Sequence, residues 1–137
     1  MRCALLALAF AACAPPATRA AEQPAGAPED AGLRVEVDAP GRALTLANGD
    51  TATLYYQLFE RRFAALVNWA PCRPDIMTCP AVAPNGRTRI PFDSIRGYGP
   101  DARDAIVYWW RLRRLPDGSA RPDSVRSRIV SLGARVP

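Results

Sequence analysis

From residue 33 onward the chain is a series of short runs of alternating character, each ended by turn residues. Leu33–Val37 alternates apolar with charged side chains, which is typical of a strand with one buried face. The Pro40–Gly41 pair ends that run, and Asn48–Asp50 is a strong turn signal after the next run, Ala43–Leu46. Because no stretch shows a convincing amphipathic helix, the pattern predicts a fold made of strands.

Further runs complete the predicted set of strands, at 51–59, 63–69, 87–95, 105–113 and 124–132. The runs Thr51–Phe59 and Phe63–Trp69 are joined by a short polar link, which is typical of a hairpin. Pro91 indicates an edge position or a bulge in the weaker 87–95 run. About seven strands in about 100 residues, with turns at short and fairly even spacing, predict an all-β antiparallel sandwich.

Three features of this pattern belong together: Trp69 in a middle strand, the Pro84–Gly86 turn before a short strand, and Tyr108–Trp110 in the penultimate strand. Over Leu33 to Leu132 this order resembles an immunoglobulin or fibronectin type III-like domain of bacterial envelope proteins. The sequence departs from antibody-type domains, because no cysteine pair is placed to bridge two sheets behind Trp69. The resemblance implies a two-sheet fold, and a shared fold does not define an activity.

The first twelve residues predict an export signal. Arg2 is followed by an apolar run through Ala12 that is too short to span a bilayer as a helix. Phe10–Cys13 resembles a bacterial lipobox, in which small residues precede the cysteine. The resemblance implies that Cys13 becomes the first mature residue and carries lipid, and that the following Ala14 sorts the protein to the outer membrane.

Free secretion after cleavage at Ala20 is the alternative, because Thr18–Ala20 has small residues at the two key positions. The segment from 14 to 31 is rich in proline and nearly free of large apolar side chains, so it cannot bury enough surface to order itself. We therefore expect a signal peptide at 1–12, a lipid-anchored disordered tether at 13–32 and a β-sandwich domain at 33–137.

Cys72 and Cys79 lie between two of the predicted strands. Two cysteines of an exported chain normally pair. A structural zinc site needs four nitrogen or sulfur ligands, and the chain has no His and only Cys13 as a further cysteine after processing. A thioredoxin-like redox pair has two intervening residues, whereas six separate these cysteines. We therefore predict a disulfide that stabilises the domain by roughly 2–3 kcal/mol.

Prolines at 71, 74 and 80 further stiffen this loop, so Ile76 and Met77 are expected to be displayed with little freedom. A loop ordered in advance loses little entropy on binding, which is how some protease inhibitors and binding modules present their side chains. The alternative is that the disulfide only orders a long crossover between the sheets.

The strand predicted at 105–113 has two faces. Its expected core face carries Ile106, Tyr108, Trp110 and Leu112. Its expected outer face carries Val107, Trp109, Arg111 and Arg113, and pairing with the last strand would add Arg126 and Arg128 to that outer face and turn Val125 and Ile129 inward. Arginines stacked on an aromatic plane interact favourably. The outer set is therefore either a structural brace, as the resemblance implies, or a site for an acidic glycan or lipid headgroup.

Charge and composition limit the functions that we expect of the chain. All 18 basic residues are Arg and the formal net charge is +5, which permits attraction to anionic lipids or polysaccharides. Nucleic acid is not an expected partner, because the arginines are spread along the chain and an exported protein seldom meets it. With neither His nor Lys to activate a serine, and no Gly-rich phosphate loop, we expect no catalytic residue, no metal and no cofactor.

Together these features predict a non-catalytic lipoprotein of the cell envelope, held at the outer membrane by lipid on Cys13 and facing the periplasm or the exterior. Its sandwich is expected to bind or scaffold another envelope component, a protein or an anionic polymer. The alternative is a protease inhibitor or an anionic glycan-binding module that uses the Cys72–Cys79 loop or the Arg/Trp face.

Overall fold

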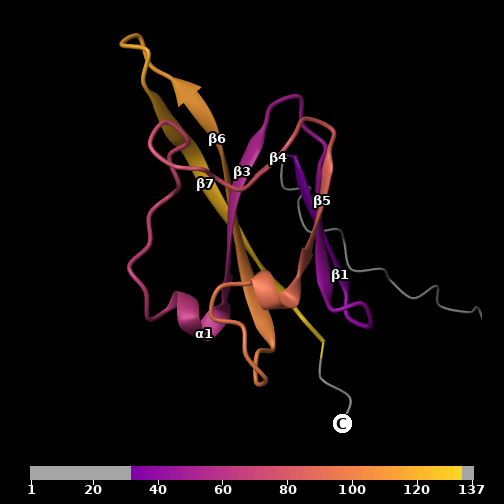
Figure 1. Ribbon diagram of the computed structural model, residues 1–137. Coiled ribbons are helices and arrows are strands. Elements are labelled where there is room, and N and C mark those ends of the chain that lie inside the picture. Colours follow the sequence, from indigo (N-terminus) through magenta and orange to yellow (C-terminus); the bar gives the residue numbers. More distant parts are fainter. Residues whose placement is uncertain (1–31, 134–137) are drawn as a thin grey trace, which may run out of the picture.

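The computed structural model describes residues 32–133, which form two antiparallel sheets facing each other (Figure 1). One sheet has three strands in the order β1-β2-β5, and the other has four in the order β4-β3-β6-β7. The strands are β1 (Leu33–Asp38), β2 (Ala43–Asn48), β3 (Leu54–Glu60), β4 (Ala81–Val82), β5 (Arg87–Pro91), β6 (Asp104–Arg114) and β7 (Ala120–Ser131). The only helical turns among these residues are α1 (Arg61–Ala64) and the 3-10 turn η1 (Phe92–Ser94). The predicted sandwich-like all-β fold is confirmed.

Several predictions lie outside the described residues. They are the signal peptide, the lipid on Cys13 and the tether as far as residue 31, together with residues 134–137 at the end of the predicted domain. Within the described part, no helix is long and apolar enough to cross a membrane.

The main core lies between the two sheets. Leu44 and Leu46 of β2 are fully buried, as is Val107 of β6. The pair Leu58 and Val107 and the pair Tyr56 and Trp109 face each other across β3 and β6. Because burying an aliphatic side chain of this size is worth about 1.5–3 kcal/mol, this layer supplies most of the driving force for folding.

The predicted orientation of the 105–113 strand is wrong. Trp109 is 2% exposed and belongs to the core between the sheets, whereas Ile106 and Tyr108 alternate onto the other face of the four-stranded sheet. Trp110 also points to that other face, yet it is only 1% exposed. Both faces of β6 are covered, so its nearly continuous apolar run does not reveal which face is the core.

The prediction of a strand at 63–69 is also wrong. The backbone N–H of Phe63 donates to Glu60 Oε2 at 2.8 Å, which starts the short helix α1 instead of a hairpin return. The chain then runs without regular structure until β4, whose Val82 pairs with Leu54 of β3. The segment from 61 to 80 is therefore a connection, and the rings of its Phe63 and Trp69 lie against Phe59 on the outer face of the four-stranded sheet.

The expectation that Val125 and Ile129 of the last strand point inward is wrong. Both residues are exposed, by 42% and 52%, whereas Val130 and Leu132 reach the core. Arg126 lies directly opposite Trp109. β7 is the edge strand of a four-stranded sheet that faces a three-stranded one, so much of its inner face is not covered and tolerates arginine.

A β-bulge accompanies this arrangement. The pairing of β6 with β7 jumps from Trp109 opposite Arg126 to Arg111 opposite Asp123. The extra residue is accommodated where Ser124 adopts a φ of 47°, a left-handed conformation often found at bulges.

Candidate functional site

The stapled loop, residues 72–79, is the first candidate site. The predicted disulfide between Cys72 and Cys79 is confirmed, with Cα atoms 5.8 Å apart. Inside the loop the carbonyl of Arg73 accepts hydrogen bonds from the backbone N–H groups of Ile76, at 3.2 Å, and Met77, at 3.1 Å. The loop is thus a compact turn closed at its base by a covalent bond.

An ion pair adds to this order. The guanidinium of Arg73 donates two hydrogen bonds to Asp75, at 3.2 and 2.5 Å. The hydrogen bond from Arg73 lowers the pKa of the Asp75 carboxyl. Because both side chains are largely open to water, this pair orders the surface of the loop and adds little to stability.

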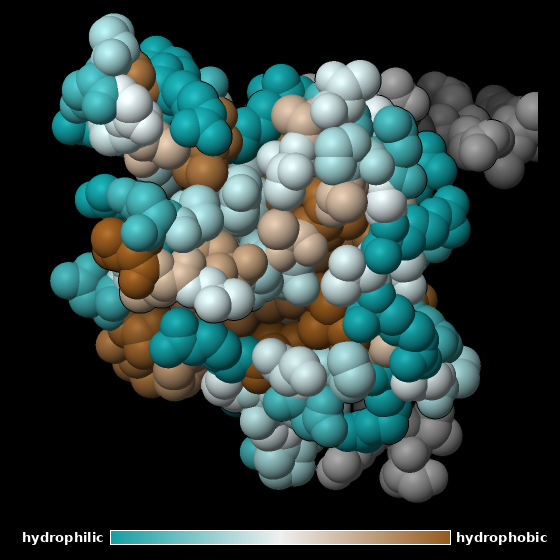
Figure 2. Space-filling view, turned by 45° about the horizontal axis from the view of Figure 1, so that its top comes forward, coloured by the Kyte–Doolittle hydropathy of each residue, from teal (hydrophilic) through white to brown (hydrophobic). Residues whose placement is uncertain are grey.

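The stapled loop displays apolar side chains on this frame. Cys72 at its base is 5% exposed, but Ile76 and Met77 are 67% and 56% exposed. Leu66, earlier in the same connection, is 83% exposed. Figure 2 shows hydrophobic surface gathered on the side of the molecule that carries α1 and this connection, at the left in both views. The stapled loop therefore presents two exposed apolar side chains on a covalently closed frame.

The predicted Arg/Trp face is only partly assembled. Trp109, Arg111 and Arg126 do meet, around a hollow of about 230 Å³. However, Trp109 is buried, and Arg111 forms an ion pair with Asp50. Arg113 is exposed farther along β6. The prediction of an exposed platform, with arginines stacked on a Trp ring, is therefore wrong.

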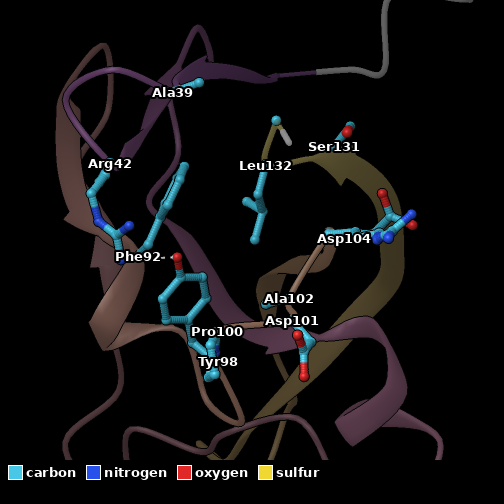
Figure 3. A pocket seen from close by; sticks show the side chains of 12 residues that line it. Ala39, Arg42, Phe92, Tyr98, Pro100, Asp101, Ala102, Asp104, Ser131 and Leu132 are labelled. Atoms are coloured by element: carbon cyan, nitrogen blue, oxygen red, sulfur yellow. Dashed lines mark hydrogen bonds between the residues drawn. The ribbon is translucent and has the colours of Figure 1, made fainter. Parts of the chain in front are cut away.

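A second hollow, of about 560 Å³, lies at the end of the sandwich where the β1–β2 turn approaches the 98–104 loop. Figure 3 shows Phe92 and Tyr98 in this hollow beside Arg42, with Asp104 and Ser131 on the other side. The Arg42 guanidinium donates to the Tyr98 hydroxyl at 3.1 Å and lies 5.7 Å from the centre of its ring. Asp104 forms an ion pair with Arg61 at 3.3 Å. The hollow thus combines an apolar floor with charged side chains of both signs, of which Arg42 and Asp104 have partners.

A third hollow, of about 640 Å³, lies at the opposite end of the three-stranded sheet. We call it the arginine hollow, and it is lined by Gly32, Leu33, Arg34, Ala47, Asn48, Gly49, Asn85, Gly86, Arg87 and Arg128. Of the residues proposed from sequence, only Arg128 lies here. The others come from the ends of β1, β2 and β5 and the turns beside them, which are far apart in the chain, so the sequence carries no local signal that they meet.

No group of three or more His, Cys, Asp or Glu residues in the 32–133 part of the chain is arranged to hold a metal ion. The fold and its sites define a class, namely a two-sheet all-β domain with a disulfide-closed loop beside its four-stranded sheet. No family model, no curated protein and no solved structure matches the chain.

Proposed function

We propose that this protein is a non-catalytic lipoprotein of the bacterial cell envelope whose sandwich binds another envelope protein through the stapled loop. The observation that carries this proposal is the exposure of Ile76 and Met77, by 67% and 56%, on a loop closed by the Cys72–Cys79 disulfide. Isolated exposed apolar residues are common on protein surfaces, whereas contiguous exposed apolar surface favours an interaction site.

Rigidity makes this tip suited to binding. The disulfide and the turn centred on Arg73 have already ordered the backbone before a partner arrives. Covering Ile and Met side chains contributes about 1.5–3 kcal/mol each when their burial is complete. Little of that gain is then lost to ordering the loop, so a small tip can act as an anchor of an interface.

The strand order supports placing the domain in the immunoglobulin/fibronectin type III-like group. Lettered in chain order, β1, β2 and β5 correspond to strands A, B and E, and β4, β3, β6 and β7 correspond to C′, C, F and G. A C′ strand joined to the sheet of C, F and G is an arrangement known from immunoglobulin-like sandwiches. A chain that lacks His, the commonest general base, agrees with a non-catalytic role.

The envelope location is supported by the sequence at the N-terminus. The apolar run after Arg2 and the lipobox-like Phe10–Cys13 favour export and lipidation. A disulfide between Cys72 and Cys79 is the form expected in an oxidising compartment outside the cytosol.

Binding by the stapled loop is tested with the full-length protein expressed with a C-terminal tag in its bacterial host. The double variant Ile76→Ser/Met77→Ser is expected to lower recovery of the envelope partner by roughly tenfold or more, because hot-spot side chains dominate an interface. Leu66→Ser is the matched control, since Leu66 is 83% exposed on the same connection but outside the loop. Equal recovery with the double variant and the wild type would remove the loop from the proposal, and mass spectrometry of the same samples reports lipid on Cys13.

A further inference from the structure

The arginine hollow is built around two arginines on one face of the three-stranded sheet. Arg34 of β1 pairs with Ala47 of β2, and Ala47 pairs on its other side with Arg87 of β5. The three side chains therefore point to the same, outer face, with the two arginines two strand spacings apart, roughly 10 Å. Between them stands only the methyl group of Ala47, which leaves the middle of the row open.

Neither arginine is neutralised by another residue that the structure describes. Within residues 32–133, the side chains of Arg34 and Arg87 form no ion pair and no hydrogen bond. Among the described residues that line the hollow none is acidic. Two like charges held on one row repel each other, so this arrangement gains stability when an anion lies between them.

Among residues 32–133, the acidic groups of this sheet and of the adjoining turn have other positions or partners. Asp50, directly after the hollow's Gly49, forms an ion pair with Arg111. Asp38, at the other end of the same sheet face, forms an ion pair with Arg89 at 3.1 Å. Glu36 lies one row away, where it shares the row with Arg89 and Thr45. Among the described residues, positive charge is thus concentrated at the end of the sheet where the hollow lies.

The floor of the hollow is rigid. Asn48 is 3% exposed, and its side-chain amide donates to the carbonyls of Ala52, Val82 and Ala83 at 2.8, 3.1 and 3.0 Å. Backbone hydrogen bonds from Gly49 to Gly32, at 2.7 Å, and from Asn48 to Gly86, at 2.9 Å, join the surrounding turns. The arginines are therefore mounted on a base that needs no rearrangement to receive a ligand.

We infer that the arginine hollow binds an oxyanion group, carboxylate or phosphate, carried on a glycan. Arginine forks match both groups with paired, charge-assisted hydrogen bonds. The volume of about 640 Å³ is in the range of small-molecule sites and exceeds the needs of a single inorganic anion. The side-chain amide of Asn85 at the rim provides a donor and an acceptor for sugar hydroxyls.

The test measures binding of the full-length protein to sodium polygalacturonate by isothermal titration calorimetry, with neutral dextran as the blank. Arg34→Gln/Arg87→Gln is expected to weaken binding by roughly tenfold or more, because both charged forks are lost. The control Arg62→Gln/Arg113→Gln removes the same charge from two exposed arginines outside the hollow and is expected to change affinity less than twofold. Arg34→Lys/Arg87→Lys keeps the charge without the guanidinium fork. Its affinity for polygalacturonate is expected to lie between the affinities of the two Gln pairs.

Competition identifies which group is preferred. Displacement of polygalacturonate by inorganic phosphate more readily than by galacturonate would assign the hollow to phosphate, and the reverse order would assign it to carboxylate. Equal weakening by the two Gln pairs would overturn the inference in favour of unspecific charge attraction. Binding to phosphatidylglycerol vesicles with none to glycan or phosphate would overturn it as well. The site does not depend on the stapled loop, so Ile76→Ser/Met77→Ser is expected to leave polygalacturonate affinity unchanged.

Discussion

The rings of Trp69 and Tyr108 are in contact, with centroids 4.1 Å apart and planes inclined by 47°. Tyr108 belongs to the outer face of β6, and Trp69 belongs to the long connection between α1 and β4. Trp69 also lies against Phe59, at 5.8 Å between centroids, and Phe59 is fully buried although it faces away from the main core. The connection that carries the stapled loop is thus fixed to the sandwich by an aromatic cluster.

Truncation of Trp69 should therefore loosen the packing of this connection on the sandwich. We expect Trp69→Ala to lower the free energy of unfolding by about 2–3 kcal/mol, less than for a fully buried Trp because part of the ring is exposed. Urea denaturation followed by far-UV circular dichroism measures the change. Leu66→Ala should stay within about 0.5 kcal/mol of the wild type, since Leu66 is 83% exposed. A similar loss in both variants would mean that Trp69 does not anchor the connection.

The disulfide should contribute to stability without being needed for the fold. The bond joins two cysteines that lie outside the core between the sheets. We expect Cys72→Ser/Cys79→Ser to lower the free energy of unfolding by roughly 2–3 kcal/mol while the strand signal of the circular dichroism spectrum is kept. Dithiothreitol should produce the same loss in the wild type and no change in the variant. A wild-type protein equally stable with and without reductant would contradict this role.

Asn48 should be the most sensitive buried polar residue. Its amide holds the carbonyls of Ala52, Val82 and Ala83, and its Oδ1 accepts from the N–H of Asp50 at 2.9 Å. Removing these partners leaves buried carbonyls unsatisfied, so we expect Asn48→Ala to cost about 2–4 kcal/mol in thermal or urea unfolding. Asn68→Ala, at an exposed position, is the control and should be nearly neutral. A small effect at Asn48 would show that water replaces the amide there.

Asp38 should titrate below its ordinary range. The backbone N–H of Gly41 and then the guanidinium of Arg89 lower its pKa from 3.8. Because this pKa is lower in the folded than in the unfolded chain, the carboxylate stabilises the fold above about pH 3.8, and that contribution is lost as the pH falls through the folded-state pKa. Carboxyl-carbon NMR titration should show the Asp38 pKa rising in Arg89→Gln but staying below 3.8, since the Gly41 bond is kept. A pKa in the wild type at or above 3.8 would contradict the two contacts.

Local patterns were sufficient to predict the strands that have one solvent face. Leu33–Val37 and Ala43–Leu46 alternate cleanly, and both lie within β1 and β2 as the structure has them. The turn at Asn85 was predicted equally well, because Asn and Gly tolerate the left-handed backbone, and Asn85 has a φ of 54°. The disulfide and the exposure of its loop were also within reach, since they depend on spacing and compartment rather than on tertiary contacts.

The orientation of β6 could not be predicted from alternation. Its run from Ala105 to Trp110 is apolar throughout, because the opposite sheet covers one face and the 61–80 connection covers the other. A run of this length without a polar residue indicates two buried faces, and it is the signal that distinguishes β6 from β1. The arginine hollow was missed for a different reason, since Arg34 and Arg87 meet only through their shared neighbour Ala47.

Site-specific photocrosslinking in living cells tests the central claim, that the stapled loop contacts an envelope protein. A photoreactive amino acid at position 77 replaces Met77, which is 56% exposed, and the control places it at Arg114, an exposed residue near the tip of the β6–β7 hairpin. The account predicts a specific protein adduct from position 77 that is absent from position 114. Adducts of equal yield from both positions, or none from position 77, would contradict it.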